Sequence, residues 1–216
     1  MIKEKYTPVE IKLDGHVLKG NLSIPENAKG MVIFSHGSGS SRLSPRNNYV
    51  AKVLNEKGLA TLLFDLLTED EDRIYENRFN IDLITLRLID VTQWVQNQKD
   101  GKDLNIGYFG ASTGAASALR AAAFYENDIR AVVSRGGRPD LAMQELNKVT
   151  APTLLIIGGR DPQVIQLNEK AYQELKCHRK LEIVPEASHL FEEPGKLQQV
   201  ADIAAAWFDM WLQKDK

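Results

Sequence analysis

The stretch that most constrains how this chain can fold is LNIGYFGASTGAASALRAAAF, residues 104–124. An apolar run at residues 105–109 stops at Gly110, and an alanine-rich segment with the composition of a helix begins after Gly114. The sequence therefore predicts a strand, a sharp turn and a helix in direct succession.

The turn itself, Gly110-Ala111-Ser112-Thr113-Gly114, has the pattern G-x-S-x-G. This pattern places a serine hydroxyl at the tip of a strained turn between a strand and a helix. The strained backbone leaves no room for side chains two residues before and two residues after the serine, and glycine at both positions removes that clash. Ser112 is therefore the candidate nucleophile of the chain.

Strand-like and helix-like segments alternate along the rest of the sequence. Residues 7–13 and 16–24 alternate apolar and polar side chains around Asp14-Gly15, which predicts a hairpin. Later apolar runs are continuous, as in parallel strands that are covered on both faces. This alternation predicts an α/β fold with a mostly parallel sheet, an N-terminal antiparallel hairpin and helices on both faces. The further strands are expected at 31–34, 60–66, 105–109, 129–134, 153–157 and 180–184, the helices at 47–57, 81–99, 115–124, 164–175 and 194–211, and a charged loop at 68–80.

Length and composition limit what kind of protein this is. With 216 residues and no repeats or linkers, residues 1–216 are expected to form a single domain. A formal net charge of −2 with interspersed charges gives no basic face for nucleic acid or an anionic membrane. Cys177 is the only cysteine, so an intrachain disulfide is excluded. Because no apolar run reaches the ~18 residues of a membrane helix, we expect a cytoplasmic protein.

Polar residues that follow the predicted strands are the candidates for chemistry, because active sites in parallel sheets gather at the carboxyl ends of the strands. One strand ends at Ser112, a later one leads to Asp161 in Gly-Gly-Arg-Asp, and the last leads to His189 in Ser-His-Leu-Phe. The chain order nucleophile, acid, histidine is that of the α/β-hydrolases.

Each of these three side chains has a chemical role in that interpretation. A serine hydroxyl is a poor nucleophile at neutral pH, so it needs a base such as His189 to take its proton. The histidine in turn needs a carboxylate that orients its ring and stabilises its cation, and Asp161 is the candidate. Asp140, after the preceding strand, and Asp65, within a predicted strand, are weaker alternatives for this acid.

The glycine-rich loop at residues 36–41 is the candidate oxyanion contributor. Two backbone N–H groups can stabilise the negative charge that develops on a carbonyl oxygen during acyl transfer. Thr113, which follows the nucleophile, is expected to supply one and Ser38 the other. Glycine on both sides of Ser38 would let the backbone approach closely. We interpret His36 as a structural residue that holds this loop.

Arginines are also expected at the carboxyl edge of the sheet. Their guanidinium groups could bind a carboxylate or phosphate, with Arg42 and Arg138 as candidate substrate-binding residues. They could equally pair with Asp140, Glu69 or Asp70, and the sequence leaves both interpretations open. The four arginines in these loops are Arg42, Arg46, Arg135 and Arg138.

Six segments of the sequence resemble the dienelactone hydrolase family, in particular its serine-bearing branch that is sometimes fused to phosphoribosyltransferases. They are HGSGSSRLSPRN, DLLTEDE, GASTGAASALRAAA, SRGGRPDLA, TLLIIGGRD and ASHLFEEPG, and the resemblance covers nearly the whole chain. It implies the α/β-hydrolase fold without a large cap domain, and supports Ser112, Asp161 and His189 as the triad. Dienelactone hydrolases proper carry a cysteine nucleophile at the position of Ser112.

The sequence thus predicts a serine hydrolase of small esters, lactones or thioesters that needs no metal and no organic cofactor. Its partner is expected to be a small-molecule substrate, with homo-oligomerisation left open. One alternative is an acyltransferase that uses the same triad. Another is a non-catalytic protein on a hydrolase scaffold whose arginines bind an anionic metabolite.

Overall fold

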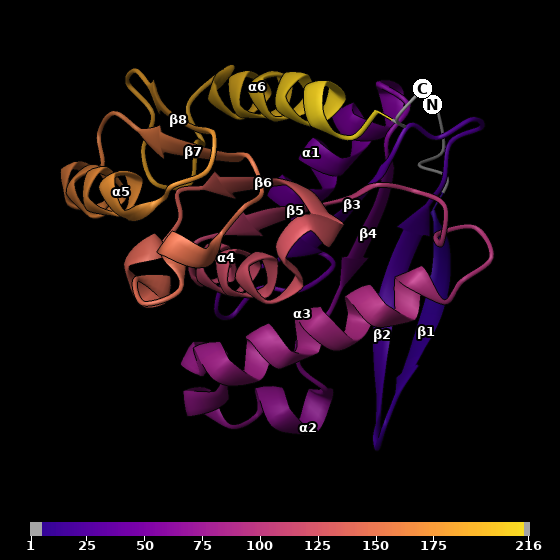
Figure 1. Cartoon of the computed structure of the whole chain (residues 1–216). Helices are drawn as coiled ribbons and strands as arrows, with labels where there is room; N and C mark the ends of the chain where they lie inside the picture. The colour runs from indigo at the N-terminus through magenta and orange to yellow at the C-terminus, as the bar shows by residue number, and fades with distance from the viewer. Residues whose placement is uncertain (1–5, 214–216) are drawn as a thin grey trace.

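An eight-stranded sheet forms the centre of the computed structural model, which describes residues 6–213 (Figure 1). The strand order is β1-β2-β4-β3-β5-β6-β7-β8. β1 and β2 pair antiparallel, β2 also runs antiparallel to β4, and all other neighbours are parallel. The predicted mostly parallel sheet with an N-terminal hairpin is therefore confirmed. The strands are β1 (Thr7–Leu13), β2 (His16–Ser23), β3 (Met31–Ser35), β4 (Ala60–Phe64), β5 (Ile106–Ala111), β6 (Ile129–Arg135), β7 (Thr153–Gly158) and β8 (Arg179–Val184).

Helices cover both faces of the sheet, as the alternation of segments predicts (Figure 1). α1 and α6 pack on one face, and α3, α4 and α5 pack on the other. No helical insertion within residues 6–213 forms a cap over the carboxyl edge of the sheet. The α-helices are α1 (Pro45–Glu56), α2 (Glu69–Asp72), α3 (Ile81–Gln96), α4 (Thr113–Tyr125), α5 (Pro162–Glu174) and α6 (Lys196–Trp211), and the 3-10 helices are η1 (Tyr75–Phe79), η2 (Glu126–Asp128), η3 (Pro139–Ala142) and η4 (Leu146–Lys148).

Two hydrophobic clusters, one on each face, fix the helices to the sheet. In β3, Val32 and Phe34 contact the cluster under α1 and α6, whereas Met31 and Ile33 contact the cluster under α3 and α4. Successive side chains of a strand point to opposite faces, so a strand that is covered on both sides must be apolar throughout. The continuous apolar runs in the sequence are the cause of this three-layer arrangement.

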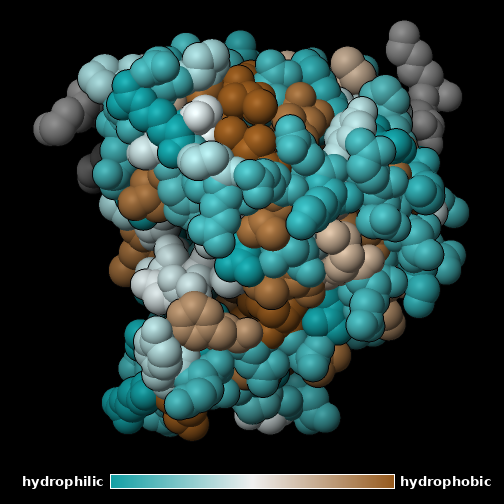
Figure 2. Space-filling view, turned by 90° about the vertical axis from the view of Figure 1, so that its left-hand side faces the viewer, coloured by the Kyte–Doolittle hydropathy of each residue, from teal (hydrophilic) through white to brown (hydrophobic). Residues whose placement is uncertain are grey.

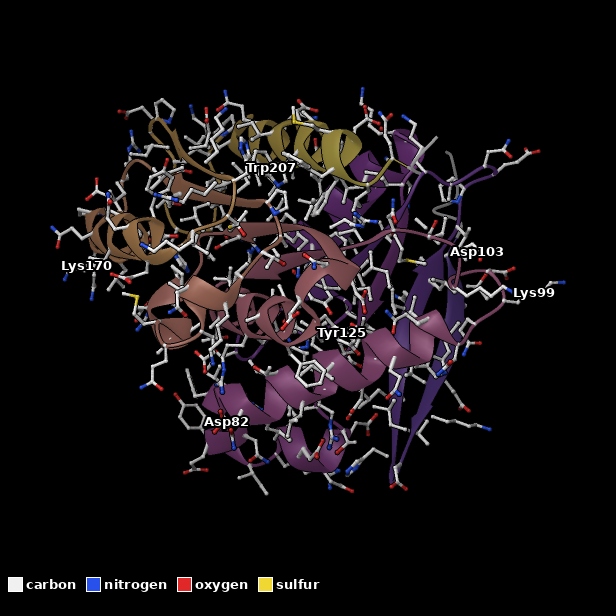
Figure 3. All side chains as sticks on the ribbon, in the orientation of Figure 1. Asp82, Lys99, Asp103, Tyr125, Lys170 and Trp207 are labelled. Atoms are coloured by element: carbon white, nitrogen blue, oxygen red, sulfur yellow. The ribbon has the colours of Figure 1, made fainter. Side chains whose placement is uncertain are left out.

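Tyr125 and Trp207, both labelled in Figure 3, add hydrogen bonds to this packing. The Tyr125 hydroxyl at the end of α4 donates to the carbonyl of Ile89 in α3 (2.8 Å). The indole N–H of Trp207 in α6 donates to the carbonyl of Pro152, just before β7 (3.3 Å). Because a buried polar group without a partner is costly, these bonds favour the burial of Trp207 and the partial burial of Tyr125.

The charged segment 68–80 differs from the predicted loop, because it contains α2 and η1. Thr68 and Glu71 form a capping box: the Thr68 hydroxyl accepts from the Glu71 N–H, and the Glu71 carboxylate accepts from the Thr68 N–H. Arg78 then donates two hydrogen bonds to the carboxylate of Asp72, at 2.9 Å each. Polar contacts within the segment therefore order it without the apolar stripe that usually reveals a helix in a sequence.

Within residues 6–213, no helix combines the length and the hydrophobicity needed to cross a lipid bilayer.

Candidate active site

The turn at Ser112 has the strained geometry that its glycines indicate. Ser112 lies between β5 and α4 with φ 52° and ψ −122°, a conformation that L-residues rarely adopt. A Cβ on Gly110 would lie 2.5 Å from the Cα of Ala115. A Cβ on Gly114 would lie 2.1 Å from the carbonyl oxygen of Ser35. Both glycines are therefore required by close backbone approach.

Gly114→Ala is expected to destabilise the fold by about 3 kcal/mol or more, because its Cβ would overlap backbone oxygens that no side-chain rotation can move. Gly15→Ala is the matched control. Gly15 also has a glycine-type conformation, with φ 72°, but nothing lies within 4 Å of its Cβ position, so the cost should be only about 1–2 kcal/mol. Urea unfolding of both variants measures the difference. Equal losses of stability would contradict the steric explanation.

His189 and Asp161 meet at the carboxyl edge of the sheet, one after β8 and the other after β7. His189 Nδ1 lies 2.7 Å from Asp161 Oδ2. Asp161 is also the N-cap of α5, where its Oδ1 accepts from the N–H of Val164 (3.4 Å). The two loops are joined by a backbone hydrogen bond from Arg160 N–H to the carbonyl of Ala187 (2.9 Å). The carboxylate is thus held on one side by a helix and contacts the imidazole on the other.

The loop after β6 contacts both Ser112 and His189. The N–H of Arg138 donates to the carbonyl of Ser112 (3.0 Å), and the N–H of Ser112 donates to the carbonyl of Arg135 (3.3 Å). Gly136, with φ 52°, lies so close to His189 that a Cβ there would be 3.5 Å from the ring nitrogen Nδ1. Within the described residues Ser112 and His189 share no hydrogen bond, and catalytic hydrogen bonds are often long before substrate binds.

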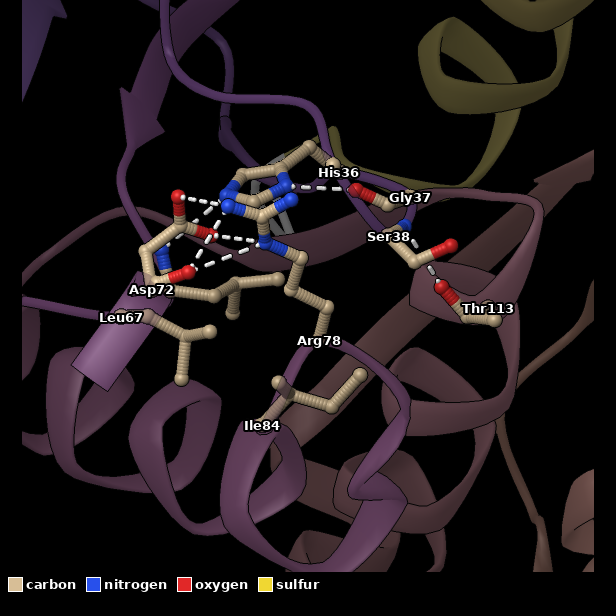
Figure 4. Close-up of a pocket in the computed structure, with 10 residues that line it drawn as sticks. His36, Gly37, Ser38, Leu67, Asp72, Arg78, Ile84 and Thr113 are labelled. Atoms are coloured by element: carbon tan, nitrogen blue, oxygen red, sulfur yellow. Dashed lines mark hydrogen bonds and ion pairs between the residues drawn. The ribbon is translucent and has the colours of Figure 1, made fainter. Parts of the chain in front are cut away.

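The backbone N–H of Ser38 lies next to the start of α4, where it donates to the Thr113 hydroxyl (2.9 Å) (Figure 4). A Cβ on Gly37 would lie 3.1 Å from the Cβ of Ser112. The structure therefore brings the two candidate oxyanion residues and the candidate nucleophile together. The sequence does not indicate the hydroxyl contact, which an entering oxyanion would share or displace.

His36 fixes the loop after β3 through two hydrogen bonds to the backbone. Its Nδ1–H donates to the carbonyl of Gly37 (2.9 Å), and its Nε2 accepts from the N–H of Leu66 (3.1 Å). Burial lowers the pKa of His36 from its ordinary value of 6.5. A proton on Nε2 would also face the Leu66 N–H, so this arrangement requires the neutral ring. The geometry agrees with the structural role that we inferred for His36.

This buried histidine predicts a pH dependence of stability. Below about pH 6.5 the unfolded chain binds a proton at His36 more readily than the folded chain, so stability falls as the pH falls, by up to about 1.4 kcal/mol per pH unit. His36→Asn should be less stable at neutral pH but should lose less stability between about pH 7.5 and about pH 5.5. Urea unfolding at both pH values measures this. Parallel losses in the two proteins would exclude His36 as the cause.

The other acidic candidates have different partners. Asp140 accepts two hydrogen bonds from Arg138, both 2.8 Å. Asp65 lies just after β4 rather than within it, and it pairs with the side chain and the backbone N–H of Arg42. Arg138 thus pairs with Asp140, one of the partners that the sequence left open, whereas Arg42 pairs with Asp65, which was not among the expected partners.

Glu193 is a residue of this site that sequence reasoning missed. Both of its carboxylate oxygens accept from the N–H of Ser188 (3.1 and 3.0 Å), directly before His189. These backbone hydrogen bonds lower the pKa of Glu193. Phe191, which lies between His189 and Glu193 in the sequence, is buried and has φ 57°. The segment Phe-Glu-Glu offers no pattern that predicts this contact, which depends on the loop closing back on itself.

The cavity beside Ser38 and Thr113 is small. It has a volume of about 10 Å³, room for about one water molecule, and Leu67, Arg78 and Ile84 are among the residues that line it (Figure 4). Figure 2 views the molecule from the carboxyl edge of the parallel strands, where hydrophobic patches lie within a largely hydrophilic surface. Among residues 6–213, no group of three or more His, Cys, Asp and Glu side chains is placed to hold a metal ion.

Comparisons with known proteins identify the fold and the family of this chain. A family model described as an alpha/beta hydrolase domain matches residues 28–206. The chain is 52% identical to a dienelactone hydrolase of known structure from Anabaena variabilis, over 97% of this chain and 99% of that one, with a TM-score of 0.94. Est1E from Butyrivibrio proteoclasticus is 19% identical over 94% of this chain and 98% of that one, with a TM-score of 0.81, and so shares the fold.

A curated relative from Mycobacterium tuberculosis strain H37Rv is longer than this chain. It carries a provisional phosphoribosyl transferase name and is 58% identical over 189 residues, which are 88% of this chain and 43% of the relative. The chain therefore spans less than half the length of the curated relatives it matches.

Proposed function

The chain belongs to the dienelactone hydrolase family of α/β-hydrolases, and from that premise we propose that it is a serine hydrolase of small esters, lactones or thioesters. The observation that carries this proposal is the strained Ser112 turn, joined through the loop after β6 to a histidine that contacts a carboxylate. Because no cap covers the carboxyl edge within the described residues, the substrate would enter an open site. We place this activity in the cytoplasm.

In the proposed reaction, the Ser112 hydroxyl attacks the carbonyl carbon of the substrate while His189 Nε2 takes its proton. Asp161 accepts the hydrogen bond from Nδ1–H and stabilises the imidazolium that forms. The backbone N–H groups of Ser38 and Thr113 stabilise the negative charge on the carbonyl oxygen. His189 then protonates the departing alcohol or thiol, which leaves an acyl group on Ser112.

Water completes the cycle. His189 removes a proton from a water molecule, which attacks the acyl carbon, and the acid is released as Ser112 regains its proton. None of these steps needs a metal or an organic cofactor.

Covalent labelling tests the proposal directly. A fluorophosphonate probe should modify Ser112, as mapped by mass spectrometry of the digested protein, because such probes react with activated serines. The labelled protein should no longer release p-nitrophenol from p-nitrophenyl acetate. A protein that neither reacts with the probe nor turns over any activated ester would argue against the proposed function.

A further inference from the structure

Two arginines are buried to the same extent in this fold, but they have different partners. Arg87 in α3 and Arg135 at the end of β6 each expose 6% of their surface. Arg87 forms an ion pair with Glu71. Arg135 instead donates from Nη2 to the amide oxygen of Asn47 (3.0 Å), and no carboxylate in the described part of the chain pairs with it. The Nε atoms of both arginines lack a hydrogen-bond partner. The two arginines therefore differ in that Arg87 has a carboxylate partner and Arg135 has none.

A charged side chain that acts on Arg135 carries the same sign. Burial, and to a smaller extent Coulomb repulsion from Arg46 in the first turn of α1, lower the pKa of Arg135 to about 10. Arg46 itself forms a 3.1 Å ion pair with Glu192, whose side chain is largely exposed. The Nε of Arg46 is buried and has no hydrogen-bond partner. Both arginines therefore lie at the first turn of α1, where Glu192 pairs with Arg46 and not with Arg135.

This arrangement is costly unless an anion completes it. A buried ion without a counter-charge costs several kcal/mol, and a neutral amide such as that of Asn47 does not offset the charge. The site also lies at the first turn of α1, a helix of 12 residues, where the helix dipole favours negative charge. Arginine binds oxyanions through two parallel N–H donors, and two arginines together form a typical carboxylate or phosphate site.

We propose that Arg135 and Arg46, at the first turn of α1, form a binding site for an oxyanion. The ligand is a negatively charged group with oxygen acceptors: either free phosphate, or the carboxylate or phosphate of a small organic molecule. The site is separate from the residues proposed to do the chemistry, but the backbone of Arg135 accepts the hydrogen bond from the N–H of Ser112. Arg46 also contacts Glu192, in the loop that carries His189. Binding an anion here should therefore stabilise the fold and hold the end of β6 close to the loop that carries His189.

Thermal unfolding in inorganic phosphate tests this site without reference to activity. At constant ionic strength set with sodium chloride, phosphate should raise the Tm with the logarithmic dependence of a single site, by roughly 5–10 °C at about 100 times its dissociation constant. Arg135→Met should abolish the rise. Without phosphate, Arg135→Met should melt no lower than the unmodified protein, because methionine fills similar space and removes an uncompensated charge.

Arg87→Met is the matched control, since it removes an equally buried arginine that has a carboxylate partner. It should lower the Tm, because it leaves Glu71 unpaired, and it should keep the full response to phosphate. Arg46→Met is a second test at a more exposed position and should weaken the response at least about tenfold in phosphate concentration. The proposal is overturned if phosphate does not raise the Tm of the unmodified protein, or if it raises the Tm of Arg135→Met and Arg46→Met as much as that of the unmodified protein.

Kinetics distinguish the two sources of the oxyanion, and this arm alone depends on the proposed hydrolase activity. If the bound oxyanion is part of the substrate, phosphate should inhibit competitively the hydrolysis of p-nitrophenyl esters that carry a carboxylate. It should not inhibit the hydrolysis of p-nitrophenyl acetate. If phosphate inhibits the hydrolysis of both esters to the same extent, or inhibits neither, and still raises the Tm, the site binds a free anion. In a protein without esterase activity the Tm result still decides whether the site exists.

Discussion

Replacing Ser112 with alanine is expected to lower kcat for p-nitrophenyl acetate by at least about 10⁴-fold, because the nucleophile of the proposed acyl-enzyme is removed. The fold should persist, since the strained backbone, with φ 52°, is no worse for alanine than for serine. Release of p-nitrophenol measures the activity, and thermal unfolding measures the stability. The fluorophosphonate probe should no longer modify the protein.

Ser40→Ala is the control for this experiment. Ser40 lies in the same loop as Ser38, and its N–H donates to the carbonyl of Gly37 (3.1 Å), a bond that the substitution leaves in place. Its activity should stay within a few-fold of the unmodified protein. An alanine at position 112 that retained substantial turnover would show that another group attacks the ester, and the proposed mechanism would fail.

The fold was predictable because its main determinants are local. Continuous apolar runs such as Thr153–Gly158 identify strands that are covered on both faces, and Asp14-Gly15 between alternating segments identifies a hairpin. The turn at Ser112 was predictable for a related reason. Its two glycines are required because a Cβ on Gly110 or Gly114 would lie 2.5 or 2.1 Å from neighbouring backbone atoms. This steric requirement can be recognised in the sequence as the pattern G-x-S-x-G.

The pairing of charged side chains was not predictable, because it depends on which loops meet in space. The sequence left open whether the loop arginines bind a ligand or pair with acids. In the structure Arg42 and Arg138 pair with carboxylates, while Arg135, which is the last residue of β6 rather than a loop residue, donates to an amide. Nothing in the residues next to Arg135 indicates this difference. It follows from the direction in which β6 points its last side chain, toward the start of α1.

The segment 68–80 shows a second limit of sequence reasoning. Its helices are short and polar, and the contacts that order them involve only charged and hydroxyl groups, such as the Thr68–Glu71 capping box. One of those groups, Glu71, also pairs with Arg87 of α3, which fixes the segment to the rest of the fold. Hydrophobic periodicity cannot detect such a segment, although the pattern T-x-x-E at its start is a helix-initiation signal.

Asp161→Asn is expected to lower kcat by about 10⁴-fold, because an amide can present N–H toward His189 Nδ1 and so favour the tautomer that leaves Nε2 protonated and unable to act as base. Stability should change little, since asparagine caps a helix about as well as aspartate and Asp161 is the N-cap of α5. The substitution thus separates the orienting role from the capping role. Ester hydrolysis and thermal unfolding of the same sample measure the two.

Asp140→Asn is the matched control, because Asp140 is the alternative acid that the sequence left open. It removes an ion pair with Arg138, whose side chain is 40% exposed, and such pairs contribute about 0–1 kcal/mol. Activity should therefore stay within about tenfold of the unmodified protein, which corresponds to about 1.4 kcal/mol. If Asp140→Asn lost activity while Asp161→Asn kept it, the orienting acid would be Asp140. The 2.7 Å contact between His189 and Asp161 would then serve the fold rather than the reaction.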